Sequence, residues 1–84
     1  MQDLSAANVI RATSDNREAV ESSGECACYS CVRRYPATEI TEYTGGPSEC
    51  AVCPYCHVDA VLPDYVMTAS INDLRGLRRQ WFGI

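Results

Sequence analysis

The chain has 84 residues, of which 46% are hydrophobic, and a formal net charge of −4. This length favours one domain with a thin core, which small natural proteins often reinforce with disulfides, a metal ion or a partner subunit. The acidic balance disfavours nucleic-acid binding because it repels phosphate backbones at long range, and no stretch has the apolar length of a membrane span.

The N-terminal stretch MQDLSAANVIRATSDN has neither the basic nor the apolar region of a secretory signal peptide. We therefore expect a cytoplasmic protein. In that reducing compartment, clustered cysteines bind a metal or carry out redox chemistry more often than they form disulfides.

Residues 5–23 are expected to form a helix in one or two pieces, with a weak apolar face that must dock on the rest of the chain. Ser14 or Asp15 is suited to cap a second piece. Gly24 is expected to end the helix in a left-handed conformation.

Residues 25–63 form a cysteine module. Its six cysteines are Cys26, Cys28, Cys31, Cys50, Cys53 and Cys56. Cys28 and Cys31 bracket one CxxC unit, CYSC, and Cys53 and Cys56 bracket another, CPYC, with 21 residues between Cys31 and Cys53. Each CxxC turn directs two thiolates at one point, and two such turns complete a closed tetrahedral S4 shell. The spacing therefore predicts one structural zinc ion held by these four cysteines.

Other uses of these residues remain open. Cys26 and Cys50 are either additional or substitute ligands, or small buried thiols near the site. His57 directly follows Cys56, which indicates a turn residue at a position where glycine is usual rather than a ligand. An iron–sulfur cluster uses the same ligands, and CPYC is also a thiol–disulfide redox motif, but only 28 residues follow Cys56, too few for the rest of a glutaredoxin fold.

The remaining elements are short. We expect a helix over residues 37–43, although Ile40, Thr41 and Tyr43 would also suit a strand, and further strands within 49–53 and 57–63. Residues 70–82 are expected to form a second flanking helix, because Ser70 and Asp73 resemble a capping box.

The C-terminal helix carries apolar residues near helical spacing: Ile71, Leu74, Leu77 and Trp81. Trp81 is expected to pack on the zinc module or the N-terminal helix. The alternative is that it belongs to an exposed patch that binds a partner or a second copy of the chain. The overall prediction for residues 1–84 is a single zinc-stabilised small α+β domain, a zinc-ribbon-like two-knuckle module between two helices.

The residue composition also favours some classes of function over others. The chain has one histidine, no Ser/His/Asp set and no glycine-rich phosphate loop, so an enzyme is not expected. A protein–protein interaction module is the leading interpretation, and a homo-oligomer is compatible with it; a nucleic-acid-binding zinc ribbon is the runner-up. The candidate partner-binding residues are Arg33, Arg34, Arg75, Arg78, Arg79 and Tyr55. The alternative interpretation of the arginines is that they form an ordinary solvated helix surface. The alternative for the tyrosines is that they lie at the edge of the core.

Three stretches, NREAVESSGECACYSCVRRYPATEI, AVCPYCHVDAVLPD and RRQWFG, resemble a family of short bacterial and phage proteins with CxCxxC and CPYC knuckles. The resemblance spans residues 16–83 and implies a small zinc-ribbon-like fold. It places Cys26 with the four knuckle cysteines in the shared pattern and leaves Cys50 outside it. Ala27, Ser30 and His57 replace the commoner Gly, Tyr and Gly. The family implies no known activity, so a regulator or inhibitor of a larger bacterial or phage–host complex is an expectation only.

Overall fold

The computed structural model describes residues 4–65 and 68–84; residues 1–3 and 66–67, which the predicted domain of 1–84 includes, lie outside the described part. In chain order the elements are α1 (Ala6–Thr13), α2 (Arg17–Ser22), β1 (Glu25–Cys28), β2 (Arg33–Pro36), the 3-10 turn η1 (Ala37–Glu39), β3 (Val61–Pro63) and α3 (Ile71–Phe82). The small α+β class expected from the sequence is confirmed.

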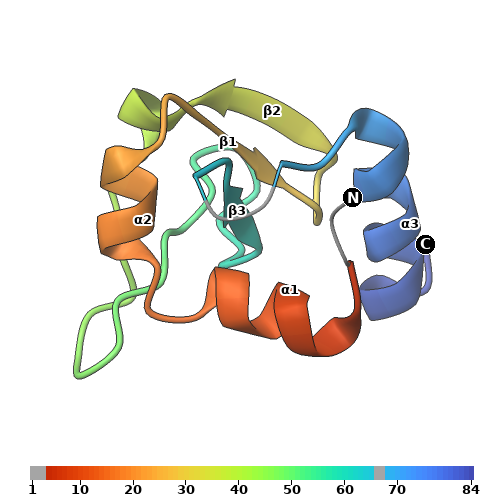
Figure 1. Ribbon diagram of the computed structural model, residues 1–84, viewed down its shortest axis with the longest axis horizontal. Coiled ribbons are helices and arrows are strands. Elements are labelled where there is room, and N and C mark those ends of the chain that lie inside the picture. Colours follow the sequence, from red (N-terminus) through yellow and green to blue (C-terminus); the bar gives the residue numbers. More distant parts are fainter. Residues whose placement is uncertain (1–3, 66–67) are drawn as a thin grey trace.

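A three-stranded antiparallel sheet in the order β2-β1-β3 forms the centre of the molecule. β1 and β2 make a hairpin in which Cys26 pairs with Tyr35, and β3 returns from a distant part of the chain so that Val61 pairs with Cys28. The helices surround this sheet: α1 and α2 contact β3, and α3 packs beside β2 (Figure 1). The hairpin was not predicted, because cysteines interrupt the usual alternation of apolar and polar residues.

The N-terminal helix is divided in two at Asp15, which has a φ of 47°. The prediction that Ser14 or Asp15 caps α2 is wrong: Asn16 occupies the N-cap and its side chain makes no capping bond. Instead the buried Asn16 amide donates to the carbonyls of Ala12 (3.1 Å) and Val61 (2.9 Å). Its Oδ1 accepts from the Ala51 N–H (2.8 Å), so this one side chain joins α1, β3 and the loop before the second knuckle.

The other end of α2 also differs from expectation. The helix ends at Ser22, Ser23 is its C-cap, and Gly24 is not left-handed, so that prediction is wrong. The Ser23 side chain instead makes two hydrogen bonds. Its hydroxyl donates to the Ala19 carbonyl (2.7 Å) and accepts from the Tyr65 N–H (2.9 Å), which holds α2 against the segment after β3.

The middle of the chain is less regular than predicted. The helix expected over residues 37–43 is wrong beyond η1, and Tyr43 instead forms an isolated antiparallel bridge with Ala51. That bridge replaces the strand expected within 49–53. The strand expected within 57–63 is confirmed only as β3, where Val61 and Leu62 are fully buried.

The C-terminal helix agrees with the sequence. The Asp73 N–H donates to the Ser70 hydroxyl (3.1 Å), and the Ser70 N–H donates to the Asp73 carboxylate (3.0 Å), which is the reciprocal capping box. Gly83 ends α3 in the left-handed conformation with a φ of 72°. Leu74 and Leu77 are buried and join α3 to the core, which fixes the helix against the cysteine-bearing sheet.

Candidate metal centre

Four cysteine sulfurs lie together: the Sγ atoms of Cys28, Cys31, Cys53 and Cys56 are all within 4.8 Å of one another. Cys28 Sγ is 3.6 Å from Cys56 Sγ, and Cys31 Sγ is 3.7 Å from Cys53 Sγ. A tetrahedron with zinc–sulfur bonds of about 2.3 Å has sulfur–sulfur edges of about 3.8 Å. The donor set therefore fits one tetrahedral metal ion, and the six cysteines are unbridged.

The sheet brings the two knuckles together. Cys28 is the last residue of β1, so the turn of the β1–β2 hairpin is the first knuckle. The second knuckle precedes β3, and it closes on itself through hydrogen bonds from Cys53 N–H to the Val58 carbonyl (3.0 Å) and from His57 N–H to the Cys53 carbonyl (2.9 Å). Because β3 pairs with β1 at Cys28, the second knuckle is carried beside the first.

Both knuckles use the same backbone turn. The residue after each second cysteine has a positive φ, 56° at Val32 and 64° at His57. This left-handed conformation is easiest for glycine, and it is costly for a β-branched residue such as Val32. The expectation that His57 is a turn residue at a glycine-type position is confirmed. The two CxxC units therefore share a left-handed residue directly after the second cysteine.

Backbone amides within the turns face the sulfurs. The Tyr55 N–H donates to the Cys53 Sγ at 3.4 Å. Burial raises the pKa of the Cys28 thiol, while the Cys31 and Ser30 amides oppose this rise. Burial also raises the pKa of the Cys31 thiol, to about 11. A cation among the sulfurs offsets such a cost, because metal-bound thiols are deprotonated outright.

The pKa of the Cys53 thiol shifts in the opposite direction to those of Cys28 and Cys31. Burial tends to raise its pKa, but the Tyr35 hydroxyl and the Cys56 and Tyr55 amides outweigh that effect and lower the pKa to about 7. Burial, and next the Cys53 sulfur, raise the pKa of Tyr35 in turn. Tyr35 is 4% exposed, and its buried hydroxyl has no oxygen or nitrogen acceptor within residues 4–65 and 68–84. A thiolate at Cys53 is the acceptor that it lacks, which supports a metal-bound thiolate there.

The remaining cysteines lie outside this cluster. Within residues 4–65 and 68–84, the sulfurs that gather are those of the four knuckle cysteines only. Cys26 is buried in β1 opposite Tyr35, and burial raises its pKa to about 12. Cys50 accepts a hydrogen bond from the Asp15 N–H (3.3 Å). His57 is likewise not among the gathered ligands.

The predicted partner-binding arginines are in different situations. Arg34 is held by ion pairs with Asp64 and Glu25 and donates to the Ala69 carbonyl (2.7 Å), so it connects the sheet to the start of α3. Arg33 lies over the ring of Tyr55, 4.7 Å from its centroid. Arg75, Arg78 and Arg79 lie on α3.

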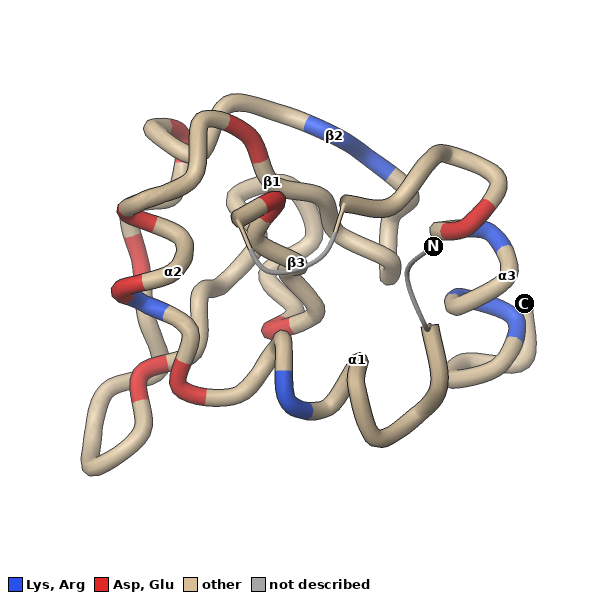
Figure 2. Tube along the Cα trace, viewed as in Figure 1, with Lys and Arg blue, Asp and Glu red and all other residues tan. Residues whose placement is uncertain are grey.

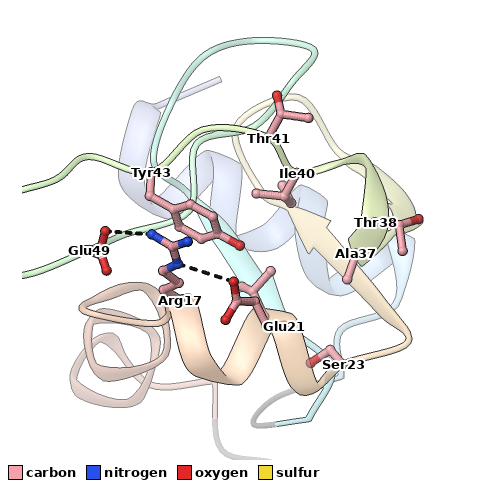
Figure 3. A pocket seen from close by; sticks show the side chains of 10 residues that line it. Arg17, Glu21, Ser23, Ala37, Thr38, Ile40, Thr41, Tyr43 and Glu49 are labelled. Carbon is pink, nitrogen blue, oxygen red and sulfur yellow. Dashed lines mark hydrogen bonds and ion pairs between the residues drawn. The ribbon is translucent and has the colours of Figure 1, made fainter.

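A hollow of about 540 Å³ lies apart from the cysteines, between α2 and residues 37–49. Figure 3 shows Arg17 at its edge, bonded to Glu49 (2.9 Å) and Glu21 (3.2 Å) and lying over the Tyr43 ring. These groups satisfy one another, and the ion pairs with Glu49 and Glu21 raise the pKa of Arg17. Sequence reasoning missed this cluster because it joins residues 32 positions apart.

No protein-family model, curated protein or solved structure matches the chain. Among the described residues, no helix is both long and apolar enough to cross a membrane. The four-cysteine cluster makes the protein a plausible small metal-binding module.

Proposed function

We propose that the protein is a zinc-ribbon-like module in which one structural zinc ion, held by Cys28, Cys31, Cys53 and Cys56, supports a protein-binding surface. The proposal rests above all on the mutual approach of the four sulfurs from two CxxC turns. Four thiolates fill the tetrahedral shell, so no coordination position is left for substrate or water, and the ion would be structural rather than catalytic. We therefore do not expect an enzyme.

The size of the cysteine cluster supports the choice of zinc over an iron–sulfur cluster. The cross-knuckle sulfur–sulfur distances of 3.6 and 3.7 Å suit a single ion. A cluster contains several iron and sulfide ions and needs its thiolates further apart. Zinc is also redox-inert, which suits a site whose purpose is to hold the fold.

A binding role is supported by what surrounds the metal site. Tyr29, within the first knuckle, contacts Trp81 and Phe82, with ring-centroid distances of 6.3 and 5.8 Å. In the second knuckle, the Tyr55 side chain is half exposed and lies beneath the Arg33 guanidinium group. Aromatic and arginine side chains on a rigid platform are the preferred contributors to protein interfaces. A regulator or inhibitor of a larger bacterial or phage–host complex is consistent with these features.

The two rival functions have less support. Arg34 is committed to Asp64 and Glu25, which reduces the basic surface that a nucleic acid would need. The CPYC unit lies in a turn rather than at the first turn of a helix, where redox dithiols gain a stable thiolate.

The cysteines test this proposal directly. Cys28→Ser or Cys53→Ser should abolish zinc binding and unfold the protein, since a structural zinc contributes about 10–16 kcal/mol of apparent binding energy. Cys50→Ser is the matched control and should keep both zinc and fold. Zinc content by atomic emission and secondary structure by circular dichroism are the measurements. Equal damage from Cys50→Ser, or a folded zinc-free Cys53→Ser variant, would refute the proposed ligand set.

A further inference from the structure

The outer face of α3 combines apolar and cationic side chains. Ile71, Arg75, Arg78 and Phe82 follow one another at spacings of four, three and four residues, which places them on one face of a helix. We call these four residues the α3 stripe, together with Arg79 on one flank and Trp81 on the opposite flank, in line with the buried Leu74 and Leu77. Its large apolar members remain in contact with solvent: Ile71 is 40%, Phe82 44% and Trp81 36% exposed.

Among the described residues, the arginines of the α3 stripe have no anionic partner. Ion pairs within residues 4–65 and 68–84 involve Arg17 and Arg34, and none involves an arginine of α3. Arg78 Nε is shielded from solvent and has no hydrogen-bond acceptor. The acid within α3, Asp73, is used by the capping box. The exposed guanidinium groups of Arg75 and Arg79 are therefore available to a carboxylate, with which arginine forms bidentate pairs, and Arg78 can offer only the nitrogens that remain in contact with solvent.

Charge is divided across the molecule. In Figure 2 acidic residues are concentrated around α2 and the neighbouring turns, with others near β3 and with Asp73 at the start of α3, while arginines lie on α3 and β2 and also on α1 and α2. The net charge of −4 repels a long phosphate chain, and α3, at 12 residues, is only about 18 Å long, which offers no extended basic track. The small cationic area with apolar side chains at each end suits a short segment in which acidic residues lie between apolar ones.

We infer that the α3 stripe docks an acidic, amphipathic segment of a partner protein. This inference rests on the proposed protein-binding function and names the surface and the chemistry of the partner. The apolar side chains of the segment would cover Ile71, Trp81 and Phe82, and its carboxylates would pair with Arg75, Arg78 and Arg79. Tyr29 links the stripe to the first knuckle, so the metal-bound fold supports its C-terminal end.

Trp81 is the single tryptophan of the chain and reports directly on the α3 stripe. The zinc-loaded full chain is titrated with a peptide of about three helical turns that carries Glu and Leu at helical spacing, and Trp81 emission is followed. We expect a saturable change that weakens as salt is raised. Parallel titrations use the same peptide with Gln for Glu, a poly-dT oligonucleotide, and phosphatidylcholine vesicles containing phosphatidylglycerol.

Two arginine variants provide the control. Arg75→Glu should weaken the acidic peptide about tenfold, whereas Arg11→Glu, an equal change of charge at an exposed position of α1, should leave binding within about twofold. Equal loss from Arg11→Glu would overturn the inference, as would equal binding of the Gln peptide. Tighter binding of the oligonucleotide or vesicles, or no change with the acidic peptide, would also overturn it. Zinc content is measured in each sample. Loss of zinc would count against the proposed function. A zinc-loaded protein whose Trp81 emission does not change on titration would contradict only the docking inference.

Discussion

His57 is held in a conformation that suits glycine better. Its φ of 64° costs about 1–2 kcal/mol for a residue with a Cβ, while its side chain is exposed and its N–H still closes the knuckle. His57→Gly should therefore raise the melting temperature by a few degrees, because relief of strain exceeds the extra chain entropy of about 0.5–1 kcal/mol. Thermal melting of the zinc-loaded protein checks this. His57→Ala keeps the strain and should give no gain; a similar rise in both variants would mean that the imidazole, not the backbone, destabilises the turn.

Tyr35 offers a test of the surroundings of the metal. If its buried hydroxyl donates to the metal-bound Cys53 thiolate, Tyr35→Phe should weaken zinc binding about tenfold, as the loss of an outer-shell partner does at other metal sites. Competition with a chromophoric chelator measures the affinity, and Tyr43→Phe, away from the cysteines, is the control. If the hydroxyl has no partner in the metal-bound protein, the phenylalanine variant will instead be more stable and bind zinc unchanged, since an unsatisfied buried group has been removed.

At the scale of elements, α3 depends on the core more through its leucines than through its tryptophan. Leu74 is fully buried, so Leu74→Ala should cost about 2–5 kcal/mol. Trp81 keeps 36% of its surface exposed, so Trp81→Ala should cost less than the roughly 3–5 kcal/mol of a core tryptophan. Chemical denaturation of the zinc-loaded variants ranks them. A larger loss for Trp81→Ala than for Leu74→Ala would show that Trp81 is the main contact between α3 and the core.

The elements also show what the sequence could and could not predict. The capping box and the helical spacing of the apolar residues are local signals, so α3 was predicted closely. β1 and β2 were missed because each has four residues and the cysteine spacing hides their pattern. The pairing of β1 with β3 and the hydrogen bonds of Asn16 with Val61 and Ala51 join positions far apart in the chain, and no local pattern encodes them.

The candidate site was predicted better than the fold around it. CxxC spacing depends on the geometry of a tight turn and of a tetrahedral ion, both of which are local, and the four gathered sulfurs are the four that spacing selects. The arginines were less predictable: Arg34 carries the same local signal as Arg33, yet only the tertiary structure sets it against Asp64 and Glu25. Composition alone could not separate structural arginines from those available to a partner.

For the whole molecule, the metal would dominate stability. A domain of this size has a total stability of about 5–15 kcal/mol, which is similar to the binding energy of one structural zinc. The cluster joins the β1–β2 turn to the segment before β3, and Tyr29 extends its influence to α3. The sheet, the two knuckles and the α3 stripe therefore form one metal-dependent unit in this account.

X-ray absorption spectroscopy of the purified protein tests whether one zinc ion is bound by the four knuckle cysteines. The account predicts a zinc edge and a single shell of four sulfur atoms at about 2.3 Å, with no light-atom ligand. It also predicts that Cys50→Ser gives the same spectrum. A shell that contains nitrogen or oxygen would mean that His57 or water is a ligand. An iron edge with a metal–metal distance would mean that the site holds an iron–sulfur cluster instead of zinc. A folded protein without bound metal would contradict the proposed structural role of the metal.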